Sequence, residues 1–154
     1  MRVALVAGEL GVGGLPNHVL ALARMLSAAG NDVMVAHGNA PLPAHLDVAG
    51  LTLRHLPGLE AAAAEPEATA AARALRDWAP DVVHVHFCGG VAALRGMVDA
   101  GLPLVRTFHD LTSVCLRRGR RRWYGDRCQR ALSVGCVAWG CLLSPPPPGA
   151  RLPR

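Results

Sequence analysis

The sequence contains no lysine, and all 16 of its basic residues are arginines. Without a Gly-Lys-Ser/Thr triplet, the chain cannot form the phosphate-binding loop of a Walker-type nucleotide hydrolase. It also lacks the Gly-x-Ser-x-Gly turn that holds the nucleophile of an α/β-hydrolase. Aromatic residues make up 4% of the chain and hydrophobic residues 51%, so the core is expected to be aliphatic.

Long hydrophobic runs are also missing. No apolar stretch approaches the roughly 20 residues that a membrane-spanning helix needs. The apolar start, residues 1–7, is too short for a signal peptide and leads into a glycine-rich loop. We therefore expect a cytoplasmic protein, in which the five cysteines are thiols or metal ligands rather than disulfides.

The net charge of +5 is unevenly distributed. Residues 1–116 carry 7 arginines and 10 acidic residues (−3), whereas residues 117–154 carry 9 arginines and 1 acidic residue (+8). No nucleic-acid partner is expected, because the first three quarters lack a basic face interleaved with aromatic or polar side chains. The run Arg117–Arg122 predicts a solvated loop. The alternatives are contact with a diphosphate or a peripheral contact with anionic lipid at the inner face of the membrane.

Strand and helix signals alternate over the first 108 residues. Apolar runs predict five strands, at 2–7, 32–37, 51–56, 81–87 and 102–108. Helices are expected from residue 15 or 16 up to Gly30, and at 61–79 and 91–100. This alternation predicts an α/β fold: a Rossmann-like parallel sheet with right-handed crossovers and helices on both faces.

The alternation ends at Asp110. Residues 111–143, which hold the arginine run, are expected to be an insert within a domain of residues 1–143, followed by a disordered proline-rich tail at 144–154. The insert contains four cysteines, Cys115, Cys128, Cys136 and Cys141. They include no C-x-x-C pair, so a four-thiolate zinc clasp is only weakly indicated and unligated thiols are the alternative.

A glycine-rich loop joins the first strand to the first helix. Glycines such as Gly13 and Gly14 let backbone N–H groups approach a ligand, and the helix N-terminus that follows favours phosphate. The loop is not a dinucleotide fingerprint, because Pro16 stands where the third glycine is needed and the second strand ends in His37 rather than an acid. A tight turn with no ligand is the simpler alternative.

Polar side chains follow the strands where ligands bind in open parallel sheets, at the carboxyl edge. They are Glu9, His37, His86, His109 and Asp110. His109 is the best candidate, because Asp110 and the glycine loop should lie close to it. His18, in the first turn of the first helix, also faces this crevice or else the solvent. Each histidine has a structural role as its alternative.

A weaker hypothesis is a metal-dependent hydrolase. His84 and His86 lie on one face of the fourth strand, a spacing seen in such enzymes. Only Asp110 is expected at a neighbouring strand end to complete the site, and the side chain of His84 is expected to sit deep.

Taken together, five segments resemble the N-terminal domain of the family 4 glycosyltransferases, which have two domains in the GT-B arrangement. They are GGLPNHV (13–19), LARML (22–26), AGNDVMV (29–35), PDVVHVH (80–86) and GLPLVRTFHD (101–110). The resemblance covers residues 1 to about 143, and the cysteine-bearing insert resembles one found in some bacterial members.

The resemblance implies transfer of a sugar from a nucleotide sugar with retention of configuration, without a metal or other cofactor. Gly13 and Gly14 would approach the donor diphosphate and the acceptor, and His109 would contact the donor sugar. His18, Glu9 and Asp110 would support them. The acceptor, held chiefly by this domain, would be a sugar, a lipid or a small molecule.

The family's second domain carries the cations that neutralise the leaving diphosphate, and the chain stops at residue 154. We therefore expect little or no activity from this chain alone. It would be a fragment, a truncated product or one half of a split enzyme that needs the missing C-terminal domain or a separate complementary half. A non-catalytic α/β binding module is the alternative.

Overall fold

The computed structural model describes residues 1–88, 90–109, 128 and 133–138. The chain divides into two compact units, Met1–His109 and Asp110–Arg154. Helix α4 (Gly135–Ala138) is the element described in the second unit. The predicted tail at 144–154 and most of the predicted insert at 111–143, including Arg117–Arg122, lie outside the described residues.

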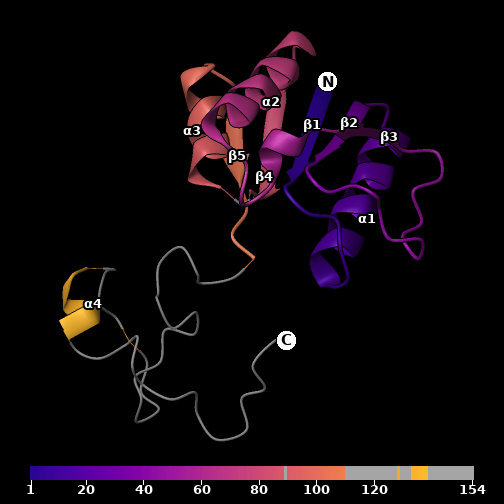
Figure 1. The fold of residues 1–154 in the computed structure, drawn as a ribbon. Coiled ribbons are helices and arrows are strands. Elements are labelled where there is room, and N and C mark those ends of the chain that lie inside the picture. The colour runs from indigo at the N-terminus through magenta and orange to yellow at the C-terminus, as the bar shows by residue number, and fades with distance from the viewer. Residues whose placement is uncertain (89, 110–127, 129–132, 139–154) are drawn as a thin grey trace, which may run out of the picture. The chain divides into compact units, whose positions relative to one another are not determined.

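The first unit is built on a parallel sheet of five strands in the order β3-β2-β1-β4-β5 (Figure 1). The strands are β1 (Arg2–Ala7), β2 (Asp32–His37), β3 (Thr52–His55), β4 (Val82–Phe87) and β5 (Leu104–Arg106). All four pairings are parallel. The predicted fold class is therefore confirmed.

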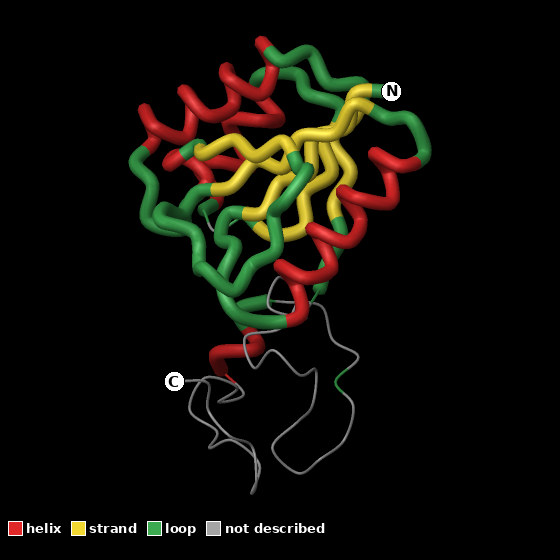
Figure 2. The backbone as a smooth tube through the Cα atoms, turned by 90° about the vertical axis from the view of Figure 1, so that its right-hand side faces the viewer, coloured by secondary structure: helices red, strands yellow, loops and turns green. Residues whose placement is uncertain are grey.

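Helices cover both faces of the sheet (Figure 2). Helix α1 (Gly14–Ala28) lies on one face, and α2 (Glu65–Asp77) and α3 (Val91–Asp99) lie on the other, with the short 3-10 helix η1 (Pro57–Leu59) packed against α2. None of the helices in the described part of the chain combines the length and the apolar character that crossing a bilayer requires.

The core has two layers because β1 is apolar at every position after Arg2. Val3 and Leu5 face α1, where they pack with Val19 and Leu20. Alternate residues of the same strand face the other way, into a cluster made with the small residues of α2 and with Met97 of α3. Burial on both faces is what a continuous apolar strand predicts.

The predicted helix at 61–79 is shorter in the structure, where α2 spans Glu65–Asp77. Residues 61–64 do not belong to α2: a turn follows η1, and the N–H of Ala64 donates to the carboxylate of Glu67 at 3.2 Å. The helix ends at Asp77, shortly before Ala79 adopts a positive φ of 51°.

The fifth strand spans Leu104–Arg106 rather than 102–108. Leu102 instead closes the end of α3, where its N–H donates to Met97 O at 3.2 Å. At the other end Phe108 is exposed and lies under the guanidinium of Arg106, 4.7 Å from the ring centroid to Cζ.

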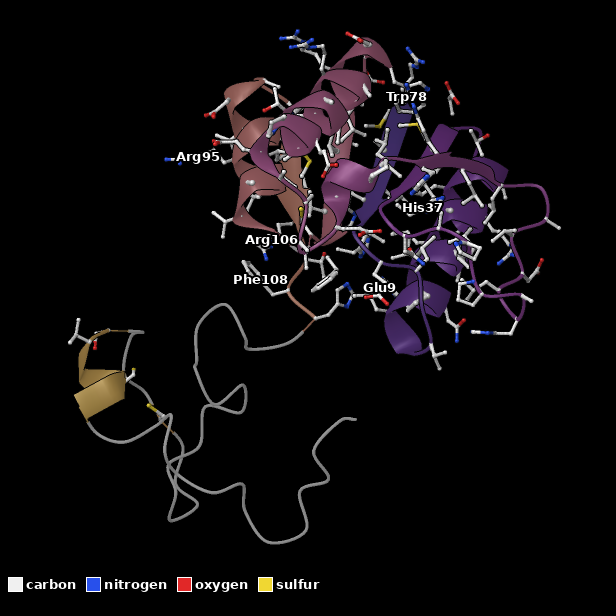
Figure 3. The ribbon with its side chains drawn as sticks, in the orientation of Figure 1. Glu9, His37, Trp78, Arg95, Arg106 and Phe108 are labelled. Atoms are coloured by element: carbon white, nitrogen blue, oxygen red, sulfur yellow. The ribbon has the colours of Figure 1, made fainter. Side chains whose placement is uncertain are left out.

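The connections that follow β1 and β4, two neighbouring strands, leave the sheet on opposite faces. From β1 the chain continues to α1 on one face, whereas from β4 it continues to α3 on the opposite face. In parallel sheets, a crevice for ligands forms outside the carboxyl ends of two such strands. Figure 3 shows Glu9 and Phe108 at this edge of the sheet and Trp78 at the opposite one.

Candidate functional site

Hydrogen bonds fix the glycine loop to its neighbours. Gly8 N–H donates to Phe87 O at 2.6 Å, and Gly38 N–H donates to Gly8 O at 3.0 Å. The side chain of Asn39 accepts from Leu10 N–H at 2.7 Å and donates to Leu10 O at 3.0 Å. The loop after β1 is thus tied to the loop after β2 and to the end of β4.

The start of α1 is open to solvent. Gly13, the residue before the helix, has φ 139°, a conformation that residues with a Cβ rarely adopt. A Cβ built on Gly13 or Gly14 meets nothing within 4 Å. Glu9 is exposed nearby in the loop, with a carboxylate oxygen 3.2 Å from the position of a Cβ on Gly11. A ligand therefore has space to approach this backbone.

Three histidines from different elements meet at the carboxyl edge. They are His18 of α1, His86 of β4 and His109, which follows β5. His86 Nδ1 and His109 Nε2 are 3.0 Å apart, at hydrogen-bond distance. The ring of His18 lies edge-on to both, with centroid separations of 5.3 Å from His86 and 5.4 Å from His109. We call these three residues the histidine cluster.

The cluster connects the predicted site residues to one another. His18 is on the same helix as Gly14, one turn further along, and its ring contacts that of His109. His109 therefore contacts the helix that follows the glycine loop. Asp110 lies outside the described residues.

His86 is the buried member of the cluster, with an exposed fraction of 3%, whereas His18 and His109 are exposed. The pairing of β1 with β4 passes from Val85 to Phe87, which leaves His86 without a partner on β1. Such an irregularity changes where a side chain points, and irregularities of this kind are common near functional sites.

Burial lowers the pKa of two histidines of β4, His84 and His86, which we call the inner histidines. It is the main cause that lowers the pKa of His86 to about 4, with smaller contributions from His84, His109 and His18. Burial, followed by the charges of His18 and His109, also lowers the pKa of His84. Both rings are therefore neutral at neutral pH.

His84 stands next to the cluster but has another role. Its Nε2 lies 2.7 Å from Thr107 Oγ1, and its ring is 4.0 Å from that of His86. The side chain is half-buried rather than deep, which corrects the prediction. The geometry joins His86 with His18 and His109, and not with His84, in the group of possible metal ligands.

His37 is held away from the cluster, between the ends of β2 and β3. Its Nδ1 lies 2.9 Å from Asn39 O, and its ring stacks on that of His55 at 5.5 Å. Burial lowers its pKa; the hydrogen bond to Asn39 opposes this effect and the nearby His55 adds to it. His37 thus fits the structural role that the sequence left open for it.

One contribution is absent from the sequence prediction. Asn39 is not among the predicted site residues, yet its side chain holds the glycine loop. His86 is predicted at the carboxyl edge, but its contacts with His109 and His18, which come from other elements, are not. For His18, the signal was its position one turn into the helix that follows the glycine loop.

The cysteine prediction is not tested. Cys128 and Cys136 are half-buried, and Cys115 and Cys141 lie outside the described residues. Cys88 follows β4, and burial raises the pKa of its thiol.

Comparisons with known proteins identify one family and several similar solved structures, two of which are described here. The model of Glycosyltransferase Family 4 matches residues 12–137. A crystal structure of the glycosyltransferase VinC in complex with DTDP is 21% identical, with a TM-score of 0.48 and coverage of 69% of this chain and 34% of VinC.

The second structure is the UDP-glucose 4-epimerase of Thermus thermophilus in complex with NAD. It is 18% identical, with a TM-score of 0.43 and coverage of 66% of this chain and 35% of the epimerase. The match thus spans about a third of each solved protein. No curated protein sequence matches the chain significantly.

Proposed function

Because this chain belongs to glycosyltransferase family 4, we propose that it forms the acceptor-side half of a site that transfers a sugar from a nucleotide sugar with retention of configuration. The acceptor would be a sugar, a lipid or a small molecule. The observation that carries this proposal is the meeting of His109 and His18 beside the open start of α1.

His109 is the residue to which we assign contact with the donor sugar. It is exposed, so a sugar hydroxyl can reach its ring, while Nε2 remains within hydrogen-bond distance of His86. The neutral ring of His86 is fixed by burial and serves to orient the imidazole of His109. A ring held in this way loses less freedom when the sugar binds.

The backbone at Gly13 and Gly14 is assigned to the diphosphate and the acceptor. Its N–H groups stand at the positive end of α1, and the absence of side chains leaves space for a ligand. His18, Glu9 and Asp110 are assigned supporting contacts with the hydroxyl groups of the substrates.

Charge is the reason for expecting a second component. A departing diphosphate needs preorganised cations in the transition state. The inner histidines His84 and His86 are neutral at neutral pH and do not supply them. We therefore propose that a donor-binding domain or partner provides the cations and that the chain alone has little or no transferase activity, with no metal or other cofactor in the transfer.

The test begins with the coding sequence beyond residue 154, read in all three frames for a second Rossmann-like domain. In a protein that joins both domains, His109→Ala is expected to lower kcat/KM at least tenfold, a loss of about 1.4 kcal/mol or more of transition-state stabilisation. His45→Ala is the matched control, since His45 is exposed and lies outside the histidine cluster.

Product analysis completes the test. The anomeric configuration of the product, measured by NMR, is expected to match that of the donor. Unchanged turnover in His109→Ala would remove this residue from the site. If a joined protein neither binds nor turns over any nucleotide sugar, the alternative of a non-catalytic binding module is favoured.

A further inference from the structure

The histidine cluster has the spacing of a metal site. One ligand nitrogen from each of His18, His86 and His109 lies within 4.8 Å of the other two. Two nitrogens bound to the same tetrahedral zinc ion are about 3.3 Å apart, because each Zn–N bond is about 2.0–2.1 Å long. The separation of 3.0 Å between His86 Nδ1 and His109 Nε2 is already close to that value. His18 is exposed on α1, so its ring can complete the site by rotating.

The buried histidine provides an independent observation. His86 is 97% buried, so its ring is held in one orientation, with Nδ1 facing His109. An ion bound between the two rings would use this nitrogen and not Nε2, which has no hydrogen-bond partner among the described residues.

The ligand set selects the class of ion. It consists of three imidazoles, with no carboxylate in the group that the described residues form. Mg²⁺ and Ca²⁺ prefer oxygen ligands, whereas imidazole suits zinc, copper, nickel and cobalt. We propose that His18, His86 and His109 bind a divalent transition-metal ion of the zinc class, with a fourth coordination position open to solvent.

The open position follows from exposure. His18 and His109 are exposed, so the side of the ion away from His86 faces water or a small ligand. Three protein ligands and one exchangeable position are the arrangement of reactive zinc sites rather than of structural ones. Binding of the ion does not depend on the proposed sugar transfer. If that function also holds, the ion and the donor sugar compete for His109.

Cobalt is the probe for the test. Co²⁺ bound by three histidines in a tetrahedral site gives visible d–d absorption. We expect the full chain to bind about one equivalent of Co²⁺ with this spectrum, and Zn²⁺ to displace it. Thiolate ligands add an intense near-ultraviolet charge-transfer band, so the spectrum separates the histidine cluster from the cysteines of residues 111–143.

Variants locate the site. His86→Ala is expected to abolish the visible spectrum, and His18→Ala and His109→Ala to weaken Zn²⁺ binding by about tenfold or more. His18 and His109 are exposed, so these two variants keep the test valid if His86→Ala fails to fold. His45→Ala is the control and should bind as the unmodified chain does.

Two results would overturn the proposal. One is the absence of tetrahedral Co²⁺ absorption in the unmodified chain. The other is binding that carries the thiolate band and is unchanged in both His18→Ala and His109→Ala. Either result leaves the proposed transfer untouched, because that function is tested by kcat/KM in the joined protein.

Discussion

At the residue scale, Asn39 determines the course of the glycine loop. Leu10 is fully buried, so its main-chain N–H and C=O need partners inside the protein. The amide of Asn39 supplies both, at 2.7 and 3.0 Å. One side chain after β2 thus sets the path of the segment that leads to Gly13 and His18.

Asn39→Ala is expected to destabilise the protein by about 2 kcal/mol, because the two buried groups of Leu10 lose their partners. Urea unfolding measures this loss, and hydrogen exchange of the Leu10 amide should become faster. Asn17→Ala, at an exposed position of α1, is the control and should change the free energy of unfolding little. Equal effects from both variants would contradict this role for Asn39.

The histidines show which part of the candidate site can be predicted from the sequence. Strand ends place His37, His86 and His109 on one edge, and that edge is correct. The order of strands along the edge is not contained in any local pattern, and β2 lies on the far side of β1 from β4. His37 therefore meets His55 of β3, whereas His18, from a helix, reaches His86 and His109.

At the element scale, η1 and α3 pack closely against the backbone of α2. A Cβ on Gly58 of η1 would collide with the main-chain carbonyl of Glu67. From the other side, a Cβ on Gly96 of α3 would lie 3.3 Å from Ala68 O and 3.4 Å from Ala72 Cβ. Small residues thus let η1 and α3 approach α2 closely.

Gly58→Ala is expected to lower the free energy of unfolding by about 1–3 kcal/mol, because η1 must move away from α2 to make room for the methyl group. Gly14→Ala is the matched control. Its added Cβ meets nothing within 4 Å at the first position of α1, so a gain of up to about 1 kcal/mol is expected from helix propensity. Urea unfolding of both variants checks the contrast, and a neutral Gly58→Ala would contradict it.

Element boundaries were predicted well only where local sequence decides them. β1 and β2 begin and end as predicted, because each is an apolar run bounded by a polar or glycine-rich segment. The alanine run at 61–64 has high helix propensity, but η1 and its following turn occupy the space before α2. Tertiary packing overrides propensity there.

At the scale of the whole molecule, both core layers belong to the first unit. Every buried hydrophobic residue that the structure describes lies between Val3 and Leu102. At the edge of the sheet where the strands begin, the side chains also find their partners within this unit. There Arg2 N–H donates to Asp81 at 2.7 Å, and the Arg2 guanidinium lies over the ring of Trp78.

Residues 1–109 alone are therefore expected to fold and to unfold cooperatively, with a urea midpoint close to that of the full chain. Far-UV circular dichroism follows the transition. Fluorescence adds a local probe, because Trp78 is the one tryptophan of the three that this segment contains. Non-cooperative unfolding of residues 1–109 would show that residues 110–154 contribute to the core.

The central position of β1 has a consequence for biosynthesis. Val3 pairs with Val33 of β2 and with Val82 of β4, so one neighbour is made early and the other about 79 residues later. At about 5–20 residues per second, the ribosome needs roughly 4–16 s to produce that second neighbour. During this interval one side of an apolar strand is without its partner in the nascent polypeptide. Chaperones that shield unpaired strands are thus expected to associate with the chain before its translation is complete.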